Sequence, residues 1–62
     1  MTTLEEPIQW QTPGDLAVQL QISLSTLGTW RSTGKGPKFY RFGGLIRYNP
    51  ADITAWTEAQ AS

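Results

Sequence analysis

Residues 12–39 read TPGDLAVQLQISLSTLGTWRSTGKGPKF and begin with a clear helix start. Thr12 can cap a helix, Pro13 suits its first position, and Asp15 complements the positive end of the helix dipole. Apolar residues then recur at helical spacing until about Gln21. The sequence therefore predicts a short first helix that ends near Gln21.

A second helix is expected after Ser23, which is another capping residue, and Thr33-Gly34 should end it. Its apolar and hydroxyl side chains separate onto two faces. The apolar face holds Leu24, Leu27 and Trp30, and the opposite face holds Ser25, Thr29 and Ser32, with Thr26 beside them. Two short helices joined at residues 21–22 predict a helix-turn-helix, and any small helical hairpin fits them equally well.

A β-hairpin is expected after a turn at residues 35–38, because residues 39–42 and 45–48 are β-rich runs around two glycines. A two-residue loop would pair Phe42 with Leu45, whereas a three-residue loop would pair Phe42 with Ile46. We expect the three-residue loop, because it separates apolar from basic side chains. One face then carries Tyr40, Phe42, Ile46 and Tyr48, and the other carries Phe39, Arg41 and Arg47.

A third helix is predicted from Pro50, with Asn49 as its cap and Asp52 three residues after that cap. The order helix, helix, hairpin, helix predicts an α+β fold, a winged helix-turn-helix over residues 12–62. Residues 1–11 form an N-terminal arm that Ile8 and Trp10 could anchor.

The core must be built by aromatic packing, since a 62-residue chain without cysteine has a thin core and no disulfide. We expect its aromatic members to be Trp30, Trp56, Tyr40, Phe42 and Tyr48. Phe39 is the exception, because it falls on the basic face, where it packs under Trp10 or lies exposed near a partner.

Charge is distributed unevenly along the chain, although the formal net charge is zero. All five basic residues lie within residues 28–48, and residues 16–51 contain no acid. A basic stretch of this kind is typical of a surface that binds phosphates. It could also be an ordinary solvated face, with cations that keep an edge strand from pairing with other chains.

Composition argues against several other classes of protein. The chain has no histidine and no cysteine, and its acids are scattered, so we expect no metal site, no cofactor and no enzyme activity. The first residues lack the pattern of a signal peptide, and no apolar run is long enough to span a membrane. We therefore expect a cytoplasmic protein that does not act in a membrane.

The ordered set of motifs resembles the small winged helix-turn-helix proteins of the excisionase type, which are related to the MerR DNA-binding domain. The resemblance is carried by residues 12–39, by GGLIRY at 43–48 and by DITAW at 52–56, and it spans about residues 12–59. Two residues depart from the family pattern. Gln21 stands at a turn position where glycine is usual, so we expect a left-handed backbone there. Leu45 stands at the wing tip where arginine is common.

The resemblance implies double-stranded DNA as the partner, with the second helix in the major groove and the wing near a minor groove or phosphates. Hydroxyl groups can read base edges, and basic groups can neutralise phosphates. The residues expected to contact DNA are Ser23, Ser25, Thr26, Thr29, Arg31, Lys35, Lys38, Arg41 and Arg47. Ser23 could instead serve only as a cap, and Arg31 could pack its stem over the core.

The function we expect is sequence-specific DNA binding by a phage or plasmid recombination directionality factor, which bends attachment-site DNA so that an integrase favours excision. That role implies cooperative self-association on DNA and an integrase as a further partner. A transcriptional regulator of the same fold, a phage packaging DNA-recognition domain and a protein-binding winged-helix adaptor remain open. In the adaptor, Leu45 and Phe39 would form the contact surface.

Overall fold

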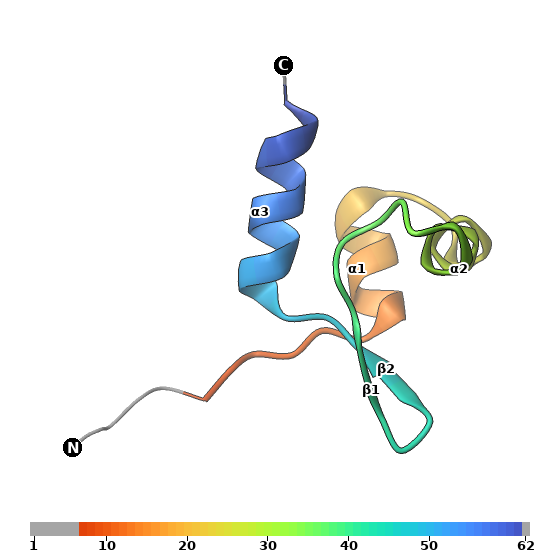
Figure 1. Ribbon diagram of the computed structural model, residues 1–62, viewed down its shortest axis with the longest axis vertical. Coiled ribbons are helices and arrows are strands. Elements are labelled where there is room, and N and C mark those ends of the chain that lie inside the picture. Colours follow the sequence, from red (N-terminus) through yellow and green to blue (C-terminus); the bar gives the residue numbers. More distant parts are fainter. Residues whose placement is uncertain (1–6, 62) are drawn as a thin grey trace.

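The structure is a computed structural model that describes residues 7–61, so residues 1–6 of the expected arm and Ser62 lie outside the described part. Three helices and one hairpin follow in the order α1 (Pro13–Leu20), α2 (Leu24–Thr33), β1 (Tyr40–Phe42), β2 (Leu45–Arg47) and α3 (Pro50–Gln60). Helices α1 and α2 form the helix-turn-helix, and the hairpin projects as a wing from the end of the molecule opposite the C-terminus (Figure 1). The predicted winged helix-turn-helix fold is confirmed.

The helix starts form as the sequence predicts. The Thr12 hydroxyl accepts a hydrogen bond from the Asp15 N–H at 3.0 Å, and the Asp15 carboxylate accepts one from the Thr12 N–H at 3.3 Å. This reciprocal pair is a capping box, which satisfies two backbone donors that the helix itself leaves free. At the start of α2 the Ser23 hydroxyl accepts from the Thr26 N–H at 3.0 Å.

The turn between α1 and α2 depends on a left-handed residue. Gln21 has φ 59° and ψ 44°, and its N–H donates to the Val18 carbonyl at 3.1 Å. The next N–H, that of Ile22, donates to the Ala17 carbonyl at 2.9 Å. These bonds close the last turn of α1 in the manner of a C-terminal cap, where glycine is usual because it has no Cβ to clash. The expectation of a left-handed backbone at Gln21 is confirmed.

Replacing Gln21 with glycine should therefore raise the free energy of unfolding by about 0.5–1 kcal/mol. Glycine removes the Cβ strain of the left-handed conformation, and its extra freedom in the unfolded chain offsets only part of that gain. Urea unfolding followed by circular dichroism measures the change. Gly34→Ala is the matched control with the opposite sign, because Gly34 ends α2 at φ 74°. An unchanged or lower stability of Gln21→Gly would show that the turn carries no strain.

The predicted hairpin register is wrong. Phe42 pairs with Leu45, Arg41 with Ile46, and Tyr40 with Arg47, so the loop has two residues. Both loop residues, Gly43 and Gly44, have positive φ, at 55° and 92°. A two-residue loop with positive φ at both positions matches the right-handed twist of the strands, and this local preference outweighs the separation of apolar from basic side chains.

The corrected register changes which side chains share a face of the wing. Tyr40, Phe42, Leu45 and Arg47 lie on one face, whereas Arg41 and Ile46 lie on the other. The two wing arginines therefore point to opposite faces, and the expectation of one basic face is wrong. Phe42 is also not a core residue, since it is 47% exposed.

The core lies where α1, α2, the end of β2 and α3 meet. Its buried residues are Leu16, Ala17, Leu27, Tyr48 and Ile53, and Leu20, Ile22, Trp30, Phe39 and Ile46 pack against them while partly exposed. Tyr48 is thus confirmed as core, and Trp30 lies at the core margin. Tyr40 and Trp56 are only half-buried.

Helix α3 attaches to the C-terminal end of α2 through its tryptophan. The rings of Trp30 and Trp56 lie 5.4 Å apart between centroids, and the Trp56 indole N–H donates to the Lys35 carbonyl at 3.0 Å. At its start, the Asn49 side chain accepts from the Ala51 N–H at 2.9 Å. Asp52 adds no second cap, because its buried Oδ2 has no hydrogen-bond partner within residues 7–61.

Trp10 anchors the chain before α1 to the wing. Its ring contacts Tyr40 and Phe42 edge-on, at 5.1 and 5.2 Å between centroids. Gln11 and Tyr48 exchange two backbone hydrogen bonds of 2.9 Å. The expected anchor at Trp10 is confirmed, whereas Ile8 is 49% exposed. Because a two-stranded hairpin is marginal alone, these contacts help to hold the wing in place.

Candidate nucleic-acid interface

The outer face of α2 carries the predicted hydroxyl groups. Ser23, Ser25 and Thr29 are exposed, and Thr26 is half-buried. The hydroxyls of Ser23 and Thr26 bond to each other at 2.9 Å, and the Thr29 hydroxyl donates to the Ser25 carbonyl at 3.1 Å. The Ser25 hydroxyl makes no hydrogen bond within the described chain, so it is the member of this set most available to a base edge or a phosphate.

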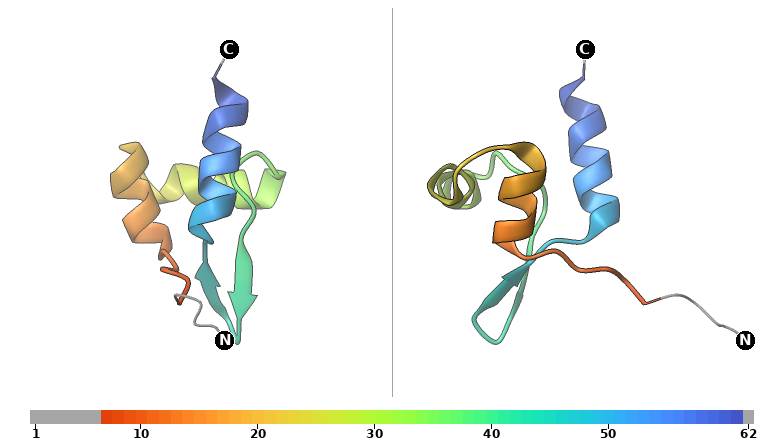
Figure 2. Two further views of the ribbon diagram at one scale, coloured as in Figure 1. Left: turned by 90° about the vertical axis from the view of Figure 1, so that its left-hand side faces the viewer. Right: turned by 180° about the vertical axis from the view of Figure 1, so that it is seen from behind.

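The wing and α2 lie on the same side of the molecule, away from α3 (Figures 1 and 2). Lys35, Lys38 and Arg41 are exposed, and Arg31 and Arg47 are half-buried. No ion pair joins a basic residue to a carboxylate among residues 7–61. The positive charge of this surface is therefore not neutralised by the part of the chain that the structure describes.

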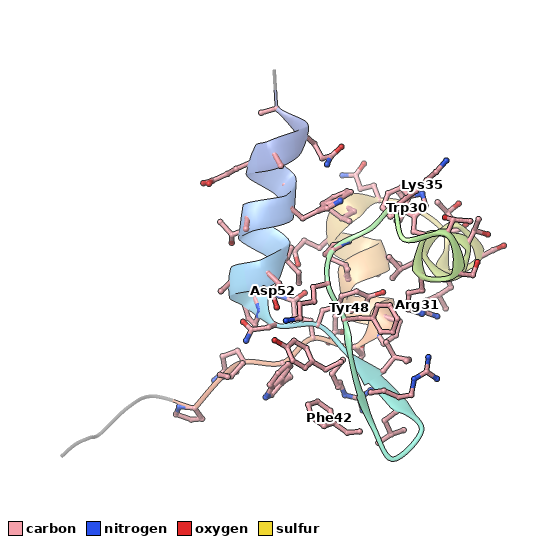
Figure 3. The ribbon with its side chains drawn as sticks, in the orientation of Figure 1. Trp30, Arg31, Lys35, Phe42, Tyr48 and Asp52 are labelled. Atoms are coloured by element: carbon pink, nitrogen blue, oxygen red, sulfur yellow. The ribbon has the colours of Figure 1, made fainter. Side chains whose placement is uncertain are left out.

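The Arg31 side chain extends from α2 to Tyr48, the residue that follows the wing. Its Nη1 donates a hydrogen bond to the Tyr48 hydroxyl at 3.1 Å, and Figure 3 shows the two side chains meeting between α2 and the hairpin. A methyl group at Gly28, one turn earlier in α2, would lie 3.7 Å from the other terminal nitrogen, Nη2. The guanidinium thus runs back along α2, as long helical side chains commonly do.

Two further cations rest on aromatic rings. The Lys38 Nζ lies 5.1 Å from the centre of the Tyr40 ring, and the Arg41 Cζ lies 5.9 Å from the centre of the Phe39 ring. Such contacts fix a cation near a surface without neutralising its charge. Phe39 also packs on Tyr48, with 6.4 Å between ring centroids, so it contacts Arg41 and the core rather than Trp10.

Arg47 lies on the opposite face of the wing from Arg41 and donates from Nη1 to the neighbouring Ile46 carbonyl at 2.6 Å. Lys35 lies near Trp30 at the C-terminal end of α2, away from Phe42 and the wing (Figure 3). The predicted basic residues therefore lie in three places. Arg41 and Arg47 lie on the wing, with Lys38 just before it. Arg31 lies beside Tyr48, and Lys35 lies at the C-terminal end of α2.

Other kinds of site have less support. Residues 7–61 contain no group of three acidic, histidine or cysteine side chains that could hold a metal ion. A surface depression of about 450 Å³ lies on the arm and α1, lined by Gln9, Trp10, Gln11, Asp15, Val18 and Gln19. None of its lining residues is basic, so it is separate from the cationic surface. None of the three helices is long and apolar enough to cross a membrane.

Two residues that hold this surface together were not predicted to do so. Phe39 supports Arg41, and the Tyr48 hydroxyl fixes Arg31. Trp10 was expected as an anchor of the arm, and its ring contacts with the wing show where it anchors. The sequence identifies Tyr48 only as an apolar core residue. Its hydroxyl was the available signal, because a buried tyrosine usually requires a hydrogen-bond partner.

Comparison with known proteins agrees with the geometry. A family model described as "Helix-turn-helix domain" matches residues 12–61, a span that includes both helices of the motif, the wing and α3. No curated protein and no solved structure matches the chain.

Proposed function

The chain belongs to the helix-turn-helix domain family, and from this premise we propose that it binds double-stranded DNA sequence-specifically through α2 and the wing. Membership of this family implies DNA as the partner. The observation that carries the proposal is the placement on the same side of the molecule of α2 and a wing whose cations form no ion pair within residues 7–61 (Figure 1). Phosphate contacts would supply affinity, and the hydroxyl face of α2 would supply base contacts.

The corrected wing register supports a specific mode of contact. Arg41 lies in the second strand pair from the loop and Arg47 in the third, on opposite faces of the hairpin. A minor groove is about 6 Å wide and has a phosphate strand on each side. A wing that approaches such a groove tip-first would present one arginine toward each strand. The wing tip itself, from Phe42 to Leu45, has no charged or polar side chain to read bases.

For the biological role, we propose an excisionase-type recombination directionality factor that binds in several copies and bends attachment-site DNA. The small size and zero net charge support weak binding by one copy, so that tight binding would need neighbouring copies or an integrase. The absence of catalytic activity is part of the same proposal. A transcriptional regulator and a packaging DNA-recognition domain use the same surface and remain alternatives.

A protein-binding adaptor is the second candidate, because the wing exposes two apolar side chains. Leu45 is 57% exposed and its cross-strand partner Phe42 is 47% exposed. The adaptor surface would therefore consist of Leu45 and Phe42, since Phe39 is partly buried against the core.

Selection of binding sites from random duplexes tests these roles in one experiment. A directionality factor should enrich direct repeats, and electrophoretic circular permutation should then show bent DNA with more than one protein per site. A regulator should enrich inverted repeats, which match a dimer with two-fold symmetry. Ser25→Ala should change the enriched sequence, whereas Gln60→Ala on α3 is the control that should not. No enrichment, or one protein per duplex at every site length, would contradict the directionality role.

A further inference from the structure

We infer that Tyr48 is a positioning residue for DNA binding: its buried hydroxyl holds the Arg31 guanidinium between α2 and the wing, where it is presented to a phosphate. The inference rests on the proposed function, and it assigns a role in binding to a residue whose burial by itself indicates only a core residue. Arg31 is half-buried and donates to Tyr48 at 3.1 Å, so its stem is fixed at the inner edge of α2.

The acceptor is held rigidly. Tyr48 is fully buried, and its ring packs on Phe39 with 6.4 Å between centroids. Its backbone exchanges two hydrogen bonds of 2.9 Å with Gln11, directly after the end of β2. The hydroxyl therefore has a fixed place between three parts of the chain: the segment before α1, the wing and α2.

Arg31 keeps most of its hydrogen-bonding capacity for a ligand. A guanidinium has five N–H donors, and the Tyr48 hydroxyl accepts from only one of its terminal nitrogens. Nη2 lies beside Gly28, at 3.7 Å from where a Cβ would stand, and it makes no hydrogen bond within residues 7–61. Two or more N–H groups in a planar fork match the oxygens of a phosphate, which is why arginine suits this ligand better than lysine.

Orienting the guanidinium before binding reduces the loss of side-chain freedom on binding. Tyr48 would act only through Arg31, because it is itself buried from any ligand. A purely structural role for the pair would instead change the stability of the fold and leave phosphate binding unchanged. The positioning role and the purely structural role therefore predict different salt dependences of DNA binding when Arg31 is replaced.

The test is a double-mutant cycle on the affinity for mixed-sequence duplex DNA, measured by fluorescence anisotropy over a salt series. Tyr48→Phe removes only the acceptor, and we expect about 5-fold weaker binding with an unchanged log–log salt slope. Arg31→Ala should reduce the magnitude of that slope by about 0.9, the value for one lost phosphate contact. In the Arg31→Ala background, Tyr48→Phe should change the affinity less than about 2-fold, because its intermediary is gone.

Thr57→Val is the control, since it also removes a single hydroxyl, and Thr57 is exposed on α3, outside the proposed binding surface. It should bind DNA like the wild type. Melting temperatures of all variants show whether each is folded at the assay temperature. Wild-type affinity in Tyr48→Phe, or a wild-type salt slope in Arg31→Ala, would overturn the positioning role while leaving DNA binding intact. A wild-type chain that binds no duplex at low salt would overturn the proposed function and this inference together.

Discussion

Replacing Leu27 with alanine should lower the free energy of unfolding by about 2–5 kcal/mol and leave much of the chain unfolded at room temperature. Leu27 has no exposed surface, and it packs from the middle of α2 into the core with Leu16 and Tyr48. A domain of this size is only marginally stable, so a loss of this magnitude approaches its whole stability. Urea unfolding followed by circular dichroism and tryptophan fluorescence measures the loss.

Leu24→Ala provides a matched control for this prediction. It makes the same substitution in the same helix, but Leu24 is 59% exposed and lies outside the buried core. We expect its free energy of unfolding to change by no more than about 0.5 kcal/mol. Alanine favours the helix at least as well as leucine, so helix propensity cannot cause a loss in either variant. Equal losses in the two variants would therefore mean that burial of Leu27 does not determine the effect, and the core described above would be wrong.

Helix starts and ends could be predicted from sequence because their signals are local. Thr12, Ser23 and Asn49 each cap a helix by bonding an N–H two or three residues away, so the partner is visible in the same short stretch. The left-handed turn at Gln21 is equally local, since the N–H groups of Gln21 and Ile22 bond to carbonyls of the preceding helical turn. It was expected because the resembling family usually has glycine at this position.

The register of the wing could not be predicted by weighing side chains alone. Two signals conflict there: separation of apolar from basic residues favours a three-residue loop, whereas consecutive glycines favour a two-residue loop. The structure follows the glycines, and Trp10 then covers the face that carries Tyr40 and Phe42. This contact comes from about 30 residues earlier in the chain, so no pattern within the hairpin predicts it.

The sequence predicts which residues belong to the candidate site, but not how their side chains are oriented. The sequence locates the cations between residues 28 and 48, but it does not place Arg41 and Arg47 on opposite faces of the wing. It also does not pair Arg31 with Tyr48, which is 17 residues away along the chain. Partners at such separations depend on how α2 packs against Tyr48, which is determined by the core that both share.

Replacing both Arg41 and Arg47 with alanine should weaken binding to duplex DNA by roughly 10- to 100-fold at moderate salt. Each phosphate contact contributes about 0.9 to the log–log salt slope, so two lost contacts should reduce its magnitude by about 1.8. The wing places the two arginines on opposite faces, which lets each meet a different phosphate strand. Anisotropy titrations over a salt series measure both quantities.

The double variant Arg41→Lys/Arg47→Lys separates charge from geometry. It keeps both positive charges, so its salt slope should stay near that of the wild type. Its affinity should fall modestly, because lysine does not reproduce the planar guanidinium that rests on Phe39 at Arg41 and bonds the Ile46 carbonyl at Arg47. If the alanine variant keeps the wild-type slope, the wing makes no phosphate contact. The exposed pair Phe42 and Leu45 would then become the better candidate for its function, as in the adaptor.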